Sequence, residues 1–268
     1  MKIQYTFALS IALCTTAGAA EDPPQEPDDA AVAFGITPVG TQCGVSTPVA
    51  NNDWYRVMSN FYNATSGTGC ITWNQSTNWN WARVSSTSVP LDPKKGPAGY
   101  PAIYQGCHYG TCSAGGYPKR VGGITNAVSN WQIAGLWSPG VWNVSYDIWF
   151  NKTLKSDQGY PNGLELMIWQ AYQGGIHPAG SKVYSGISWN GRTYDKWVGS
   201  VNGTKVVSYV RTSGDVSQTH FDLMPFIRDC KGWDGLRDDW YLQSVQAGFE
   251  IWKEGQGLTT SEFDVTVN

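Results

Sequence analysis

Three acidic side chains stand inside stretches that are otherwise apolar and aromatic. Asp147 lies in SYDIWF, Glu165 in LELMIW and Glu250 in GFEIW. Burying an unpaired carboxylate is costly, and few basic residues stand near these acids in the sequence. Such placement is typical of acids that take part in chemistry. The alternative is that Arg or Lys side chains on neighbouring strands pair with them.

If the three stretches are β-strands, each acid shares a strand face with a tryptophan, because side chains alternate between the two faces. Tryptophan rings stack on the apolar faces of sugars. Two carboxylates across a glycosidic bond are the groups that hydrolyse it, one ionised and one protonated. Alternation groups Ser145, Asp147 and Trp149; Glu165, Met167 and Trp169; and Gly248, Glu250 and Trp252.

The elements that must position these acids read as short β-strands separated by Gly-, Asn-, Pro- and Ser-rich turns. Many such strands at regular spacing are typical of a β-sandwich or barrel. One stretch, DLMPFIR at 222–228, has helical spacing interrupted by Pro225, and we expect one short helix there on the outside of the sheets. The predicted strands cover 143–150, 164–169, 205–210 and 243–252.

The composition excludes several classes of function. Only 15% of the 268 residues are charged, the formal net charge is −3, and no basic run suggests a nucleic-acid or membrane partner. No P-loop, dinucleotide glycine motif, H-E-x-x-H or G-x-S-x-G motif is present. The three histidines, at 108, 177 and 220, lack metal-ligand spacing, so we expect no metal and no cofactor.

The amino-terminal segment has the pattern of an exported protein. Residues 1–19 combine Lys2, a short apolar core and a small-residue cleavage signal, which together predict a secretory signal peptide. Residues 20–34 are acidic and rich in proline, and we expect a flexible leader. Residues 35–268 then form one domain, and the protein is expected to be secreted and extracellular.

Cysteine use agrees with export to an oxidising compartment. Cys107 and Cys112 would close a tight loop, and Cys43 with Cys70 would tie down the first hairpin. Cys230 is then a buried free thiol or pairs between chains. Sequence alone does not fix this connectivity.

Several of these stretches together resemble glycoside hydrolase family 12. The likeness runs from about Cys43 to Asn268. LELMIW resembles the nucleophile strand of that family, QAGFE with Trp252 its acid/base strand, and YDIW the strand of its helper aspartate. GCHYGTC is similar to a disulfide-closed loop of its bacterial-type members, and Asn51-Asn52-Asp53-Trp54 resembles its early Asn-Asn-Leu-Trp element.

The resemblance implies an all-β jelly roll of two curved antiparallel sheets with one short helix and an open cleft. It implies endo-cleavage of β-1,4-glucan with retention of configuration by a monomer. Glu165 becomes the nucleophile, Glu250 the general acid and then base, and Asp147 the hydrogen-bonding helper of Glu165. The residues expected to bind sugar are Asn52, Trp54, His108, Met167, Trp169 and Trp252.

The chain departs from the family pattern at Asp53, Tyr55 and Ile251, where Leu, Gly and Pro are usual. Within the enzyme class, a xyloglucan-specific endo-β-1,4-glucanase is an alternative, and a xylanase of similar fold is less favoured by the strand motifs. From another class, the alternative is a non-catalytic carbohydrate-binding protein, which needs no pair of acids. Recognition by a host as an elicitor is a third reading that sequence chemistry does not test.

Overall fold

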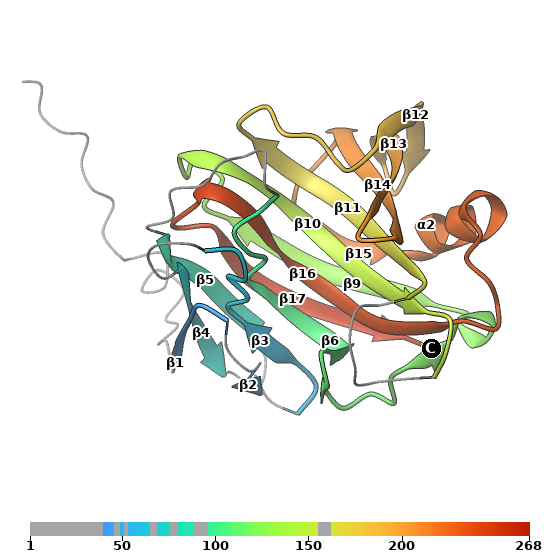
Figure 1. Ribbon diagram of the computed structural model, residues 1–268, viewed down its shortest axis with the longest axis horizontal. Coiled ribbons are helices and arrows are strands. Elements are labelled where there is room, and N and C mark those ends of the chain that lie inside the picture. Colours follow the sequence, from blue (N-terminus) through green and yellow to red (C-terminus); the bar gives the residue numbers. More distant parts are fainter. Residues whose placement is uncertain are drawn as a thin grey trace, which may run out of the picture. The chain divides into compact units, whose positions relative to one another are not determined.

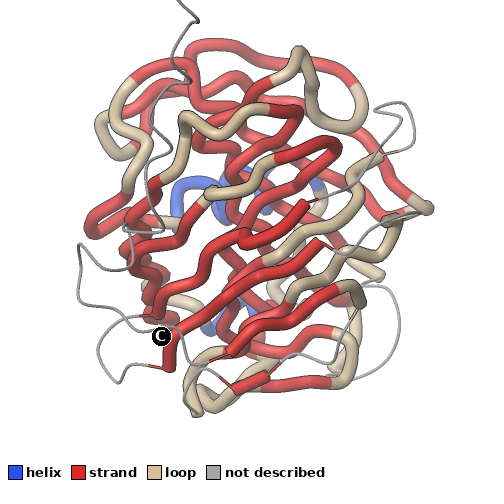
Figure 2. Tube along the Cα trace, turned by 90° about the vertical axis from the view of Figure 1, so that its left-hand side faces the viewer, coloured by secondary structure: helices blue, strands red, loops and turns tan. Residues whose placement is uncertain are grey.

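The computed structural model describes residues 40–45, 49–50, 53–64, 69–75, 80–87, 96–154 and 162–268. The predicted signal peptide, the leader and Asn52 lie outside them. Strands dominate the described part, as Figures 1 and 2 show, and helical segments are short. No helix among these residues is long and apolar enough to cross a membrane.

The strands form two main sheets. The smaller sheet has six strands in the order β1-β4-β5-β17-β9-β15, all paired antiparallel. Its strands are β1 (Gly40–Cys43), β4 (Gly69–Gln75), β5 (Asn80–Thr87), β17 (Thr259–Val267), β9 (Ala127–Ala134) and β15 (Gln218–Asp222).

The larger sheet, which holds the predicted acids, runs in the order β12-β13-β14-β11-β10-β16-β6-β3-β2. Two short strands, β7 (Thr111–Cys112) and β8 (Lys119–Arg120), pair with β6 and β16. The others are β2 (Val49–Ala50), β3 (Arg56–Met58), β6 (Ala102–His108), β10 (Gly140–Asn151), β11 (Leu164–Gln173), β12 (Ser181–Trp189), β13 (Arg192–Val201), β14 (Thr204–Ser213) and β16 (Tyr241–Glu254).

The all-β prediction is confirmed, and each predicted strand lies inside a longer one. One detail of the expected antiparallel arrangement is wrong. Strands β11 and β14 pair in parallel, because the chain passes from β11 through β12 and β13 before it forms β14 beside β11.

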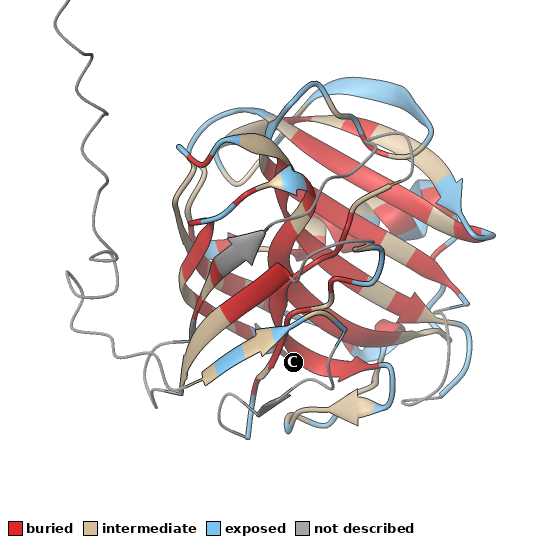
Figure 3. Ribbon diagram, turned by 60° about the vertical axis from the view of Figure 1, so that its left-hand side comes forward, coloured by how far each residue is buried: buried red, intermediate tan, exposed pale blue. Residues whose placement is uncertain are grey.

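The main core lies between the two sheets, where most side chains are buried (Figure 3). Alternate residues of β10, including Tyr146, point into it, and Tyr146 contacts Trp131 of the other sheet at 4.8 Å between ring centroids. Because alternation sends the remaining residues of β10 to the opposite face, Asp147 lies on the far side of the larger sheet from this core.

The predicted helix exists as α2 (Met224–Asp229), followed by a single π-helical turn, Cys230–Asp234. Pro225 does not interrupt it as expected. Pro225 lies in the first turn, where a missing N–H group leaves no bond unmade. Phe226 packs against the rings of Tyr194 and Tyr209 on the core side of β13 and β14.

A cluster of buried charges joins this helix to the sheet. The Lys196 ammonium of β13 forms ion pairs with Asp229 and Asp234, the latter at 2.7 Å. The Tyr209 hydroxyl donates to Asp229 at 2.6 Å, and Lys205 pairs with Asp234 at 3.4 Å. Removing one member of the cluster would leave a buried charge without its partner. The cluster therefore holds the helix against the core side of β13 and β14.

Both expected disulfides are present. Cys43–Cys70 joins β1 to β4, and Cys107–Cys112 closes the turn between β6 and β7. Cys230 is the free cysteine of the described residues, and its side chain is fully buried.

Candidate active site

The three acids reach one face of the larger sheet through the pairing of its central strands. On β10, Asp147 lies opposite Gln246 of β16 on one side and Met167 of β11 on the other. Paired residues direct their side chains to the same face. The expectation that three separate stretches belong to one sheet is therefore correct, and β10 is the strand between the other two.

Glu165 of β11 and Glu250 of β16 lie on either side of β10, at different positions along its length. Glu165 lies opposite Trp149, whereas Glu250 lies opposite Asn143. Asp147 falls between these levels. Burial raises the pKa of the Tyr62 and Tyr100 phenols, and the negative charge of all three acids raises it further. The three carboxyl groups therefore form one electrostatic unit.

Asp147 and Glu165 are hydrogen-bonded to each other. Burial raises the pKa of both well above the usual range, and repulsion from neighbouring carboxylates adds to the rise. Two acids in contact cannot both ionise at low cost, so the pair retains a proton to higher pH than either acid would alone.

Glu250 has a separate environment. Burial raises its pKa to about 7, and a hydrogen bond donated by the Asn143 amide acts in the opposite direction. The Asn143 carbonyl oxygen accepts from the Ser145 hydroxyl at 3.0 Å and from the Glu250 backbone N–H at 3.3 Å. Asn143 is thus fixed from two sides, and a carboxyl with a pKa near neutrality can both donate and accept a proton.

His108 lies at the end of β6 on the same face, beside the Gln246 side chain at 3.0 Å from Nδ1. Burial lowers its pKa to about 4, so the ring is neutral near pH 7. The Gln246 amide donates to Nδ1, which places the ring proton on Nε2. That nitrogen is buried and has no hydrogen-bond partner in the structure. The predicted contact of His108 with a sugar hydroxyl stays a prediction.

The tryptophans predicted to bind sugar lie where alternation puts them, but they are not open platforms. Trp169 is 2% exposed and Trp252 7% exposed. Trp169 packs with Met167, itself buried, and with Val206 and Val210 of β14. These side chains therefore shape the floor of the site, and their contact with sugar stays a prediction.

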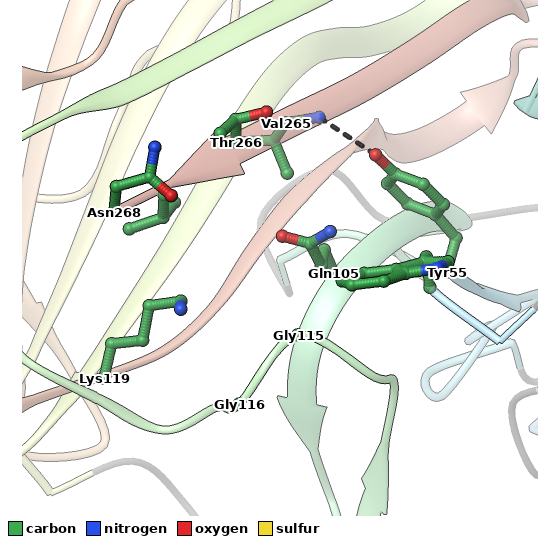
Figure 4. A pocket seen from close by; sticks show the side chains of 10 residues that line it. Tyr55, Gln105, Gly115, Gly116, Lys119, Val265, Thr266 and Asn268 are labelled. Atoms are coloured by element: carbon green, nitrogen blue, oxygen red, sulfur yellow. Dashed lines mark hydrogen bonds between the residues drawn. The ribbon is translucent and has the colours of Figure 1, made fainter.

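Trp54 is 55% exposed and lines a hollow whose lining includes none of the three acids. Figure 4 shows this hollow from close by, with the Tyr55 hydroxyl accepting from the Val265 N–H. Gln105 also lines this hollow, on the opposite face of β6 from Tyr104. The remaining lining comes from Tyr55, Gly115, Gly116, Lys119 and Val265–Asn268. The predicted stacking of Trp54 on a sugar stays a prediction, and so does the role of Asn52.

Comparison with known proteins agrees with this geometry. Residues 49–268 match the model of glycosyl hydrolase family 12. The chain belongs to this family. Endoglucanase S of Pectobacterium parmentieri is 30% identical over 202 residues, which cover 70% of each chain. A probable cellulase of Mycobacterium tuberculosis, Cel12b, is 34% identical over 151 residues, or 56% of this chain and 97% of that protein.

Solved structures of family 12 enzymes share the fold. The endoglucanase cel12A of Rhodothermus marinus superposes with a TM-score of 0.78 and 33% identity, covering 86% of this chain and 99% of that one. This family 12 member is therefore a glycoside hydrolase that acts on β-glucans. The alternative of a non-catalytic binding protein is set aside.

The sequence prediction missed three residues that interact with the acids. Tyr62 and Tyr100 were not singled out, because neither stands in a motif beside an acid. Asn143 was missed although alternation already placed it on the face of Ser145 and Asp147. That alternation was the available signal for Asn143, whereas nothing local indicated the two tyrosines.

Proposed function

We propose that this chain is a secreted, retaining endo-β-1,4-glucanase. The arrangement of the three acids supports the proposal: Glu165 is hydrogen-bonded to Asp147 at one level of β10, and Glu250 stands at another with a pKa of about 7. All three acids come from one chain, and we expect a monomer. The predicted signal peptide at residues 1–19 supports secretion.

In the first step, the Glu165 carboxylate attacks the anomeric carbon while Glu250 gives its proton to the glycosidic oxygen, which leaves with the bond electrons. The Asp147–Glu165 pair shares one proton, and the form that attacks is the one in which Asp147 holds this proton, donates a hydrogen bond to Glu165 and leaves Glu165 ionised. In the second step, Glu250 takes a proton from water, and the resulting hydroxide displaces Glu165 from the anomeric carbon. Retention requires the two carboxyl groups to lie about 5–5.5 Å apart.

Two measurements test this function. Glu165→Gln should lower kcat on barley β-glucan by at least about 10⁴-fold without changing the melting temperature by more than a few degrees. Proton NMR of the first product should show the β-anomer. Near-normal turnover of the variant would remove Glu165 from the mechanism, and an initial α-anomer would exclude retention.

The preferred glucan has two candidates. A protein of Phytophthora nicotianae described as a xyloglucan-specific endo-β-1,4-glucanase is 25% identical and covers 89% of this chain and 96% of its own length. Initial rates on carboxymethyl-cellulose, mixed-linkage glucan and xyloglucan, measured in parallel, separate the two activities. A rate at least tenfold higher on xyloglucan than on the other two would favour the second candidate.

A further inference from the structure

The row of side chains that contains Asp147 continues across the sheet beyond the acids. Met167 of β11 lies opposite Ser208 of β14, and Ser208 lies opposite Trp197 of β13. All are therefore on the face that carries Glu165. Since neighbouring strands are about 4.8 Å apart, Trp197 lies roughly 10 Å from β11 along this row.

Trp197 is more exposed than the two buried tryptophans of this face, Trp169 and Trp252. It is partly exposed and packs at the margin of the apolar cluster of Met167, Trp169, Val206 and Val210. The exposed His177 ring lies parallel to the indole, with centroids 5.5 Å apart and planes 8° apart. This aromatic pair is open to solvent and adjoins the apolar cluster beside Glu165, and β12 continues the sheet beyond it with Lys182 opposite Trp197.

The levels of the two catalytic acids indicate the direction of a bound chain. Glu165 and Glu250 are separated along the strands, at the levels of Trp149 and Asn143. A glycosidic bond held between them leads its glucan across the strands rather than along them. On one side of the bond, the chain then passes over β11 and β14 and reaches Trp197.

We propose that Trp197, supported by His177, forms a glucan-binding subsite remote from the bond that is cleaved. This inference rests on the proposed glucanase function and extends it to longer chains. The ligand is a β-1,4-linked glucan, whose apolar ring face stacks on the indole. The subsite adds binding energy for chains long enough to reach β13 and takes no part in the chemical step.

The test measures binding without turnover. In the Glu165→Gln background, the dissociation constants for cellohexaose and cellotriose are compared by calorimetry with and without Trp197→Ala. Trp233 is 81% exposed on the π-helical turn beyond the core side of β13, so Trp233→Ala is the matched control. We expect Trp197→Ala to weaken cellohexaose binding about 5- to 10-fold, and Trp233→Ala to leave it within twofold.

Active enzyme provides a second measurement. Trp197→Ala should raise KM for cellohexaose with little change in kcat and should shift the positions at which the hexamer is cut, and Trp197→Phe should restore most of the affinity. Unchanged cellohexaose affinity in Trp197→Ala would overturn the subsite. If that variant does not fold, His177→Ala decides, since this exposed ring can be removed safely: about threefold weaker binding supports the subsite, and no change overturns it.

Failure of the proposed function has a different signature. Wild-type protein that does not hydrolyse β-glucan would refute the function itself. Wild-type protein that hydrolyses it while Trp197→Ala and Trp233→Ala bind cellohexaose alike would refute only the subsite.

Discussion

Asn143 and Glu250 lie directly opposite each other on β10 and β16, and the Asn143 amide donates a hydrogen bond to the Glu250 carboxylate. Glu165 has a different partner, the Asp147 carboxyl group. Strand β10 thus supplies the Asn143 amide to Glu250 and the Asp147 carboxyl group to Glu165. This asymmetry gives two glutamates on the same sheet different hydrogen-bond partners and different surroundings for a proton.

The pH profile should depend on Asn143. Because the pKa of Glu250 is about 7, kcat/KM should fall above that pH as the proton donor ionises. The hydrogen bond from Asn143 favours the ionised form, so Asn143→Ala should raise this pKa and move the alkaline limb upward by about half to one pH unit. Initial rates between pH 4 and pH 9 measure the shift.

Asn63 offers a control for that experiment. It is exposed and donates to the Pro97 carbonyl, outside the acid cluster. Asn63→Ala should leave the alkaline limb in place. An unmoved limb in Asn143→Ala would show that the amide does not set the ionisation of Glu250.

Glu250 should reduce stability at neutral pH. Its pKa is raised from 4.5 to about 7 in the folded protein, so the folded state binds more protons between these values than the unfolded state. Its stabilising contribution is complete below pH 4.5 and is lost as the pH rises through 7. Glu250→Gln should therefore melt a few degrees above wild type at pH 8, with the difference shrinking at pH 4.

Calorimetric melting at both pH values checks this expectation. Equal melting temperatures at pH 8 would mean that the folded protein bears no cost from ionising this buried carboxyl. A variant of an exposed acid, Asp53→Asn, serves as the control for the loss of one negative charge.

His108 should act as an uncharged donor. Since burial lowers its pKa to about 4, its imidazole proton resonances should not shift between pH 5.5 and 8. Its buried Nε2 has no partner in the structure, so His108→Ala should raise KM for β-glucan by about tenfold and leave kcat within a few fold. A titration midpoint near 6.5 would contradict the assignment of a neutral ring.

The two disulfides should separate stability from activity. Cys43–Cys70 spans 27 residues and Cys107–Cys112 only 5. By the chain-entropy relation the longer loop is worth about 3.5 kcal/mol and the shorter about 2 kcal/mol. The Cys43/Cys70→Ser pair should thus lower the melting temperature more, whereas the Cys107/Cys112→Ser pair should lower kcat/KM more, because it frees the turn that contains His108.

Melting curves and β-glucan kinetics on both double variants test this separation. Should the Cys107/Cys112→Ser protein keep wild-type kcat/KM, the turn would not need its disulfide to place the histidine.

Alternation made the acid face predictable, because Asp147, Glu165 and Glu250 each stand in a regular strand with apolar residues on the other side. It does not say which strands are neighbours. The pairing of Asn143 with Glu250 joins positions 107 residues apart, and the parallel pairing of β11 with β14 depends on how β12 and β13 turn back.

The burial of individual tryptophans could not be predicted either, because it also depends on which strands are neighbours. Trp169 is covered by Val206 and Val210, which come from a strand about 40 residues later, and a local pattern does not show that. The helix was predictable from its spacing, although Pro225 begins it rather than breaking it.

The buried thiol of Cys230 can report how often the region around α2 opens to solvent. Burial raises its pKa, and the side chain stands at the junction of α2 with the π-helical turn, next to the charge cluster of Lys196, Asp229 and Asp234. An alkylating reagent can reach the sulfur only when this junction detaches from β13 and β14. Its labelling rate in the native protein therefore gives the frequency of that detachment, with no cysteine introduced by mutation and without touching either structural disulfide.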